Sequence, residues 1–161
     1  MQAYNKTELE NYFLAEEAKK LYLKKFLSKE QLQNISAQLV QLKSNANIFF
    51  RIGFFFLGSF LISTIISAFG LILFPLISED FEFIFFFYAI VAYIGLEVLV
   101  NMKFFRHGLD DAFVLTSQIS FSIGIGILTE AILPVLITML VLGVFFAIRF
   151  INTISALLAF I

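Results

Sequence analysis

Three carboxylates stand at the edges of strongly apolar segments, with basic side chains between them. Acids and bases gathered at the edge of an apolar region can form ion pairs, bind a cation or carry a proton, because burial raises the pKa of a carboxyl group. The cluster that the sequence offers for such chemistry comprises Glu97, Lys103, Arg106, His107, Asp110 and Asp111.

This cluster has three interpretations. The first, which we favour, is a structural network of ion pairs and caps that fixes the connection between two helices, because an Asp at a helix start caps the helix and meets the positive end of its dipole. The second is a cation or proton site with Glu97 and Asp111 as ligands. The third is a set of contacts to a partner subunit.

The residue types exclude several classes of active site. The chain has no Cys, so thiolate metal sites, disulfides and Cys nucleophiles are excluded, and the single His argues against a His-based metal centre. There is no Gly-rich phosphate loop and no Ser nucleophile motif. The net charge of −1 and the lack of a basic groove argue against nucleic acid as a partner. We therefore expect a protein without enzymatic activity, cofactor or metal.

The composition identifies the solvent in which these residues fold. Of the 161 residues, 60% are hydrophobic and 14% are charged, and 23 are Phe. Soluble domains have roughly 25% charged residues. A membrane protein needs no core that could bury so many apolar side chains, because lipid solvates its outer surface. The composition therefore predicts a polytopic membrane protein with the lipid bilayer as its first partner.

Residues 48–161 form the expected membrane region. The spans are predicted at about residues 52–77, 83–100, 112–128 and 131–148. The first contains 26 consecutive uncharged residues, more than the roughly 20 that cross a bilayer as a helix. Residues 150–161 are apolar but too short to cross. They are either a partial fifth span of a chain that continues past Ile161 or an apolar tail against the bundle. The predicted fold class is all-α, a polytopic transmembrane helix bundle.

Residues 1–47 differ from the rest in being rich in charge. Capping-box patterns at Thr7 and Ser28 predict two helices that run to about residues 26 and 43. Their apolar faces comprise Leu14, Ala18 and Leu21 in the first helix and Leu32, Ile35, Leu39 and Leu42 in the second. We expect an amphipathic helical hairpin. The alternative is that each helix lies separately on the membrane surface.

The basic residues predict the orientation. Residues 1–51 carry seven Lys and one Arg, and under an alternating topology Lys103, Arg106 and Arg149 fall on the same side. The connections on the opposite side, between the first and second spans and between the third and fourth, carry Glu79, Asp80, Glu82 and Glu130 but no Lys or Arg. The positive-inside rule then places the N-terminus and the loop at residues 101–111 in the cytoplasm. We expect the protein in the inner membrane of a bacterium.

Small and polar residues suggest how the spans pack. Helices in lipid associate through close contact between small side chains, and the candidates are Ser59, Ser63, Ser67, Gly124 and Gly126. In the third span, Gln118 and Ser122 share a face with Asp111. That polar face is interpreted as an interhelical hydrogen-bond seam. The alternative is a polar pathway or ligand site.

Three short segments resemble a known group of proteins. LSKEQLQNI in the second helix, RIGFFFLGSFLI entering the first span and GLDDAF entering the third resemble uncharacterised multi-span membrane proteins of Bacteroidota with a cytoplasmic N-terminal helical hairpin. The resemblance covers most of residues 1–130 and implies further spans. Those proteins often have Gly before the second helix, where this chain has Lys25-Phe26-Leu27. The resemblance implies no activity and transfers no functional residue.

The sequence thus predicts an accessory, assembly or structural subunit of a membrane complex, whose hairpin contacts a partner. Its partners would be other membrane-protein subunits or further copies of the same chain. The alternative is a proton- or cation-coupled transporter or channel component that uses the carboxylates at the membrane edge.

Overall fold

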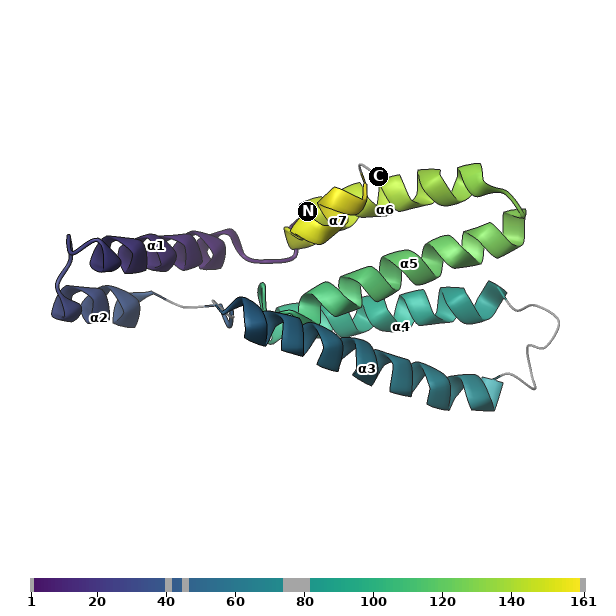
Figure 1. The fold of residues 1–161 in the computed structure, drawn as a ribbon, viewed down its shortest axis with the longest axis horizontal. Coiled ribbons are helices and arrows are strands. Elements are labelled where there is room, and N and C mark those ends of the chain that lie inside the picture. The colour runs from purple at the N-terminus through teal and green to yellow at the C-terminus, as the bar shows by residue number, and fades with distance from the viewer. Residues whose placement is uncertain (1, 40–41, 45–46, 74–81, 160–161) are drawn as a thin grey trace. The chain divides into compact units, whose positions relative to one another are not determined.

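The computed structural model describes residues 2–39, 42–44, 47–73 and 82–159. In this part of the chain every regular element longer than a single bridge residue is a helix, so the all-α prediction is confirmed. In chain order the helices are α1 (Lys6–Leu23), α2 (Lys29–Gln38), α3 (Ile48–Leu73), α4 (Glu82–Asn101), α5 (Leu109–Thr129), α6 (Ile132–Phe150) and α7 (Thr153–Leu158), as Figure 1 shows. The chain divides into two compact units. One comprises residues 4–43, and the other comprises residues 1–3 and 44–161.

The unit of residues 4–43 consists of α1 and α2. The predicted capping box at Ser28 is confirmed, because the Gln31 N–H donates to Ser28 Oγ at 3.2 Å and the Ser28 N–H donates to Gln31 Oε1 at 2.8 Å. The predicted cap at Thr7 is wrong. Asn5 is the N-cap and its side chain accepts from the Thr7 N–H at 2.9 Å, which places Thr7 inside the first turn.

The faces of α1 and α2 are only partly covered. The two helices pack against each other as a hairpin. Ala18 is buried, but Leu14 and Leu21 on the predicted apolar face are exposed. The helix α2 ends at Gln38, before the predicted residue 43, and none of its residues is buried. A considerable apolar surface of α1 therefore stays open.

The second unit contains four helices that are long and apolar enough to cross a membrane, judged by length and composition. The predicted spans coincide with α3, α4, α5 and α6 to within a few residues, although the predicted end of the first span, up to residue 77, lies outside the described residues. Two boundaries shift in a way that matters. Helix α3 begins at Ile48 and α5 begins at Leu109, so Arg51 and Asp111 are both helical residues rather than loop residues.

Helix α5 lies at the centre of this unit. It contacts α3, α4, α6 and α7, and it has the largest buried share of the four candidate spans. It is also the least apolar of the four. Lipid solvates polar groups poorly, so the most polar helix is the one shielded by the others. Close packing depends on small residues: a Cβ added at Gly58 of α3 would lie 3.0 Å from the Ala112 Cβ of α5.

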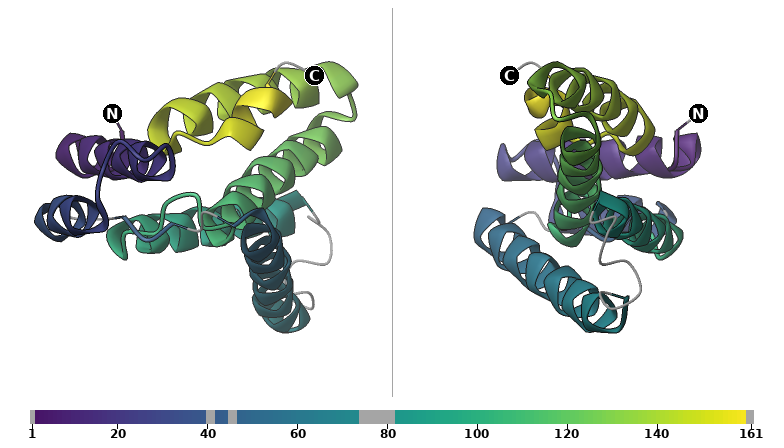
Figure 2. Two further views of the ribbon diagram at one scale, coloured as in Figure 1. Left: turned by 60° about the vertical axis from the view of Figure 1, so that its left-hand side comes forward. Right: turned by 90° about the vertical axis from the view of Figure 1, so that its right-hand side faces the viewer.

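The chain turns sharply after α6. Ile151 has a left-handed φ of 54°, and the Asn152 side chain caps α7 by accepting from the N–H groups of Ile154 and Ser155. Helix α7 then packs against α6 beside Gly143 (Figures 1 and 2). Phe150 is the last residue of α6, and residues 151–159 do not continue that helix but turn back and form a short helix lying against it.

Candidate functional site

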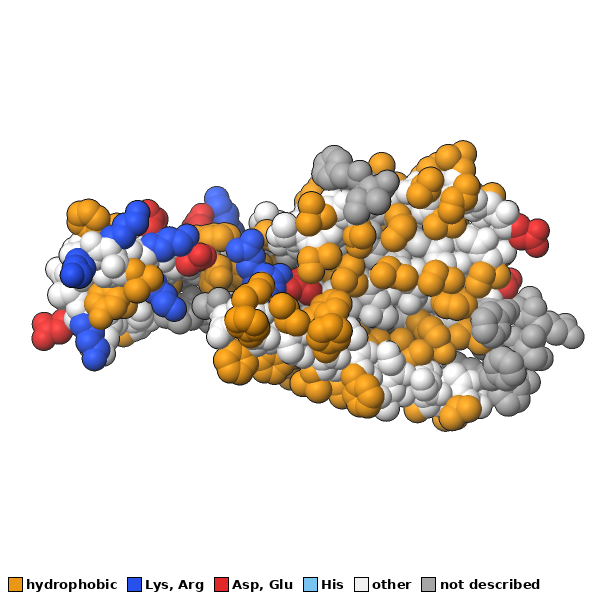
Figure 3. Space-filling view, in the orientation of Figure 1, with side chains coloured by type: hydrophobic (Ala, Val, Ile, Leu, Met, Phe, Trp, Pro, Cys, Tyr) orange, Lys and Arg blue, Asp and Glu red, His pale blue; other side chains and the backbone are white. Residues whose placement is uncertain are grey.

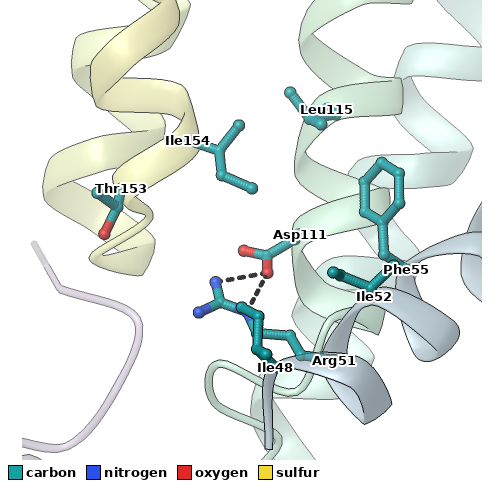
Figure 4. Close-up of a pocket in the computed structure, with 8 residues that line it drawn as sticks. All are labelled: Ile48, Arg51, Ile52, Phe55, Asp111, Leu115, Thr153 and Ile154. Atoms are coloured by element: carbon teal, nitrogen blue, oxygen red, sulfur yellow. Dashed lines mark hydrogen bonds and ion pairs between the residues drawn. The ribbon is translucent and has the colours of Figure 1, made fainter.

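Asp111 is the most deeply buried of the three membrane-edge carboxylates, with 3% of its surface exposed. Its Oδ2 accepts from Arg51 Nε at 2.8 Å and from Arg51 Nη2 at 2.6 Å (Figure 4). Its Oδ1 accepts from Asn152 Nδ2 at 2.8 Å. These partners come from α3 and from the residue that caps α7. A single carboxylate therefore ties three helices together at one end of the bundle.

Glu97 forms a second, separate pair. Its Oε1 accepts from the Tyr93 hydroxyl at 2.8 Å, one turn earlier on α4, and from Arg149 Nε at 3.0 Å on α6. The Glu97 and Arg149 side chains keep 30% and 27% of their surfaces exposed. The positive charge that pairs with Glu97 is thus the Arg149 guanidinium of α6, and not a side chain of the loop that follows α4.

Asp110 serves the loop before α5. Its Oδ2 accepts from the Arg106 N–H at 2.7 Å, and its Oδ1 accepts from the N–H groups of His107 at 2.9 Å and Gly108 at 2.8 Å. Because Gly108 has a φ of +104° and its added Cβ would lie 2.1 Å from the Arg51 carbonyl oxygen, only glycine fits there. Asp110 thus caps the loop rather than the first turn of α5, which has no side-chain cap.

The three basic residues of the predicted cluster lie in the same loop with different surroundings. Lys103 adopts a left-handed φ of 65°. The Arg106 guanidinium carbon lies 5.7 Å from the centre of the Phe105 ring. The His107 ring lies 4.2 Å from the Phe54 ring and 4.8 Å from the Phe104 ring, measured between centroids. Burial lowers the pKa of His107, and the nearby Asp110 charge opposes that shift in part.

The sequence-predicted cluster is therefore divided among three arrangements. The cations paired with Asp111 and Glu97 are Arg51 and Arg149, which the sequence analysis assigned to connections outside the spans. Asn152 was also missed. One signal could have found both arginines, because each lies beside a span boundary on the same side of the predicted topology as the acids.

The polar face of α5 is buried within the helices. Gln118 is fully buried, and its Nε2 donates to the Met139 carbonyl of α6 at 3.1 Å. The Ser122 hydroxyl donates to the Gln118 carbonyl one turn earlier, at 2.9 Å. Two atoms here, Gln118 Oε1 and Ser155 Oγ, are buried without a hydrogen-bond partner in the described part of the chain. Both residues lie beside Gly143 of α6.

The small residues of the spans divide into two groups. On α5, an added Cβ at Gly124 would lie 3.0 Å from the Phe86 ring of α4, and one at Gly126 would lie 2.9 Å from Val135 of α6. On α3, however, Ser63 and Ser67 are exposed and Ser59 is half-buried. Ser63 and Ser67 therefore do not form the interface with α5, where Gly58 makes the close contact.

Residues of helices α3, α5 and α7 line an open cavity of about 460 Å³ next to the Arg51–Asp111 pair (Figure 4). Its lining consists of Ile48, Arg51, Ile52, Phe55, Asp111, Leu115, Thr153 and Ile154. The wall is mostly apolar, and its polar groups are the ion pair and one hydroxyl. Among the residues that the structure describes, no three His, Asp or Glu side chains are grouped so as to hold a metal ion.

Comparison with protein-family models, with curated proteins and with solved structures found no match to this chain. The resemblance to membrane proteins of Bacteroidota thus stays a prediction.

Proposed function

We propose that this protein is a non-enzymatic subunit of a membrane complex, with an accessory or assembly role. The observation that carries this proposal is the exposed polar face of α3. Ser63 and Ser67 lie on the outer surface of α3, where the large exposed side chains are Phe, Ile and Leu. Small hydroxyl residues gain nothing from lipid, but they allow another helix to approach closely.

The hydrogen bonds of α3 suit a packing role. The Ser63 hydroxyl donates to the Ser59 carbonyl at 2.8 Å, and the Thr64 hydroxyl donates to the Phe60 carbonyl at 2.9 Å. These groups are satisfied within their own helix and need no water. A helix of a second chain can therefore lie across them without leaving a buried polar group unpaired.

The arrangement of the carboxylates also supports a structural role. Asp111, Glu97 and Asp110 each have two or three donors within the chain. Removing such an acid from its partners to bind a substrate would leave an arginine or several N–H groups unpaired at the membrane edge. These contacts favour the interpretation of the acids as fixed connections between helices.

Site-specific crosslinking tests this proposal. The chain has no Cys, so Ser63→Cys creates a unique thiol that can carry a benzophenone group. Leu61→Cys is the matched control, because Leu61 is also exposed but lies two residues away, on roughly the opposite face of the helix. In native membranes we expect Ser63→Cys to crosslink to one defined protein and Leu61→Cys to label lipid. Equal labelling of lipid by both would contradict the proposal.

The orientation and location form part of the same proposal. We place the protein in the bacterial inner membrane with the N-terminus in the cytoplasm, on the basis of the positive-inside rule. The test uses a thiol reagent that does not cross membranes, applied to intact spheroplasts. Glu130→Cys, between α5 and α6, should react, whereas Met102→Cys, after α4, should react only after lysis. The reverse pattern would contradict the orientation.

A proton- or cation-coupled transport role is the second candidate. The observation in its favour is that two buried oxygens, Gln118 Oε1 and Ser155 Oγ, have no hydrogen-bond partner among the described residues. Buried polar oxygens of this kind bind water or a cation in many membrane proteins. A flux in proteoliposomes that is lost in Gln118→Leu while the protein stays folded would favour this candidate.

A further inference from the structure

The turn between α1 and α2 places a lysine in the left-handed region. Helix α1 ends in a Schellman arrangement, because the Phe26 N–H donates to the Leu21 carbonyl at 3.0 Å and the Lys25 N–H donates to the Tyr22 carbonyl at 2.9 Å. In this arrangement Lys25 takes the left-handed position, with a φ of 64°. Glycine is the usual residue there, because a side chain is strained at positive φ.

The same turn exposes side chains that such a motif normally covers. The residue at the position of Phe26 commonly packs against the end of the helix. Here Phe26 is 75% exposed, and Leu23 is 70% exposed. Left-handed φ values also occur at other non-glycine residues of this chain, among them Glu130 and Ile151, so the exposure of Leu23 and Phe26 is the informative feature of this turn. Large apolar side chains open to water at one point indicate a surface for a contact.

The charge around the turn is mainly positive, although Lys20 pairs with Glu16 at 3.2 Å and Glu30 follows Lys29. Residues 18–29 contain no Asp or Glu. They contain five lysines, namely Lys19, Lys20, Lys24, Lys25 and Lys29. Figure 3 shows Lys side chains interspersed with hydrophobic ones on the surface of this hairpin. Positive charge alternating with exposed aromatic and aliphatic groups matches a surface whose outer layer is anionic and whose inner layer is hydrocarbon.

We propose that this surface, defined by Leu21, Tyr22, Leu23, Lys24, Lys25 and Phe26, docks onto anionic phospholipid. The phosphates meet the lysines, while Leu23 and Phe26 enter the boundary between head groups and acyl chains. The occupant is the bilayer in which the chain itself is anchored. An acidic partner protein is the competing occupant, and the experiment below separates the two.

The tether makes this contact available. Nine residues, 39–47, connect the end of α2 to the start of α3. Nine residues span at most about 30 Å when fully extended. The hairpin is therefore held near the bilayer at a high effective concentration, so a contact too weak to anchor a free protein is populated here. This inference does not depend on the subunit proposal, which rests on α3.

Fluorescence of the full chain tests the proposal. The protein has no Trp, so Phe26→Trp introduces a unique reporter that keeps an aromatic ring in place. The variant is reconstituted in nanodiscs of phosphatidylcholine, with or without phosphatidylglycerol, in which the acyl chains are brominated. We expect quenching of the tryptophan only when phosphatidylglycerol is present. We also expect its loss near 1 M salt, where the Debye length falls to about 3 Å.

Two further variants separate the contact from the fold of the hairpin. Lys25→Gly relieves the strained φ, so it should leave the hairpin at least as stable by circular dichroism and thermal unfolding while reducing the quenching. Lys6→Gln removes one charge at the far end of α1 and should leave the quenching unchanged. A tryptophan that is not quenched in phosphatidylglycerol discs would overturn the proposal, and so would equal quenching in Lys25→Gly and Lys6→Gln. A blue-shifted emission without quenching would show that protein covers the turn, which also overturns it.

Discussion

Arg51 and Asp111 are separated by 60 positions in the sequence, yet the Arg51 Nη2 atom lies 2.6 Å from the Asp111 carboxylate. This pair connects the first turn of α3 with the first turn of α5, and Asn152 extends the connection to α7. It lies at the edge of segments that are otherwise apolar. The pairing of the half-buried Arg51 with the buried Asp111 therefore fixes the geometry of this end of the bundle.

The first prediction concerns the stability supplied by this pair. Arg51→Gln leaves the Asp111 charge buried, and we expect a loss of about 3 kcal/mol in the free energy of unfolding, near the lower end for a broken buried pair. The Arg51 side chain keeps 26% exposure, which limits the loss. Unfolding in detergent measures it. The double variant Arg51→Gln with Asp111→Asn should recover part of the stability. Equal losses in Arg51→Gln and in the loop control Arg106→Gln would contradict this prediction.

The second prediction concerns pH. Burial lowers the pKa of His107 below 6.5 in the folded protein, so the unfolded chain takes up the proton first as the pH falls. The contribution of neutral His107 to stability is therefore complete above about pH 6.5 and decreases as the pH falls below it. Thermal unfolding at pH 7.5 and pH 5.5 should show a larger drop in the parent protein than in His107→Gln. An identical drop in both would refute the assignment.

The third prediction concerns the packing of α7 on α6. A Cβ at Gly143 would lie 2.8 Å from Ala159 Cβ and 2.9 Å from the Ser155 carbonyl oxygen, so Gly143→Ala has to displace α7. We expect a loss of about 1–3 kcal/mol in unfolding free energy. Gly53→Ala is the matched control, because nothing lies within 4 Å of its added Cβ. That substitution should stabilise α3 slightly, by up to about 1 kcal/mol. An unchanged free energy of unfolding in Gly143→Ala would mean that α7 does not pack against α6 at Gly143.

The fourth prediction separates the subunit role from transport. Glu97 is held by Tyr93 and Arg149, so Glu97→Gln should weaken the contact between α4 and α6. We expect the parent protein in proteoliposomes to show no proton or cation flux that depends on Glu97. A flux in the parent that disappears in a correctly folded Glu97→Gln variant would support the transport role and argue against the subunit role.

The helices could be predicted from the sequence because each span is a long uncharged run. Hydropathy reports the length of such a run, so α3, α4, α5 and α6 were found to within a few residues. The boundaries at charged residues were less accurate. Arg51 was expected outside the first span, but a guanidinium can join the first turn of a helix when a carboxylate such as Asp111 lies beside it.

The pairing of the site residues could not be predicted in the same way. Closeness in the chain predicts that Glu97 pairs with Lys103 and Arg106. In the structure Glu97 pairs with Arg149, which lies 52 positions away, because α4 and α6 meet only through the tertiary fold. Local spacing contains no information on that contact. The Ser63 face was likewise expected inside the bundle, whereas Gly58 made the closer contact.

The central claim is that this chain works as a subunit of a membrane complex. Native mass spectrometry of the protein, extracted from its own membrane in a mild detergent, shows whether it belongs to a larger assembly. We predict a species heavier than the 18.3 kDa chain that contains at least one further polypeptide and that dissociates when Ser63 and Ser67 are replaced by Leu. A single species at 18.3 kDa under the gentlest extraction, unchanged by those substitutions, would contradict the claim.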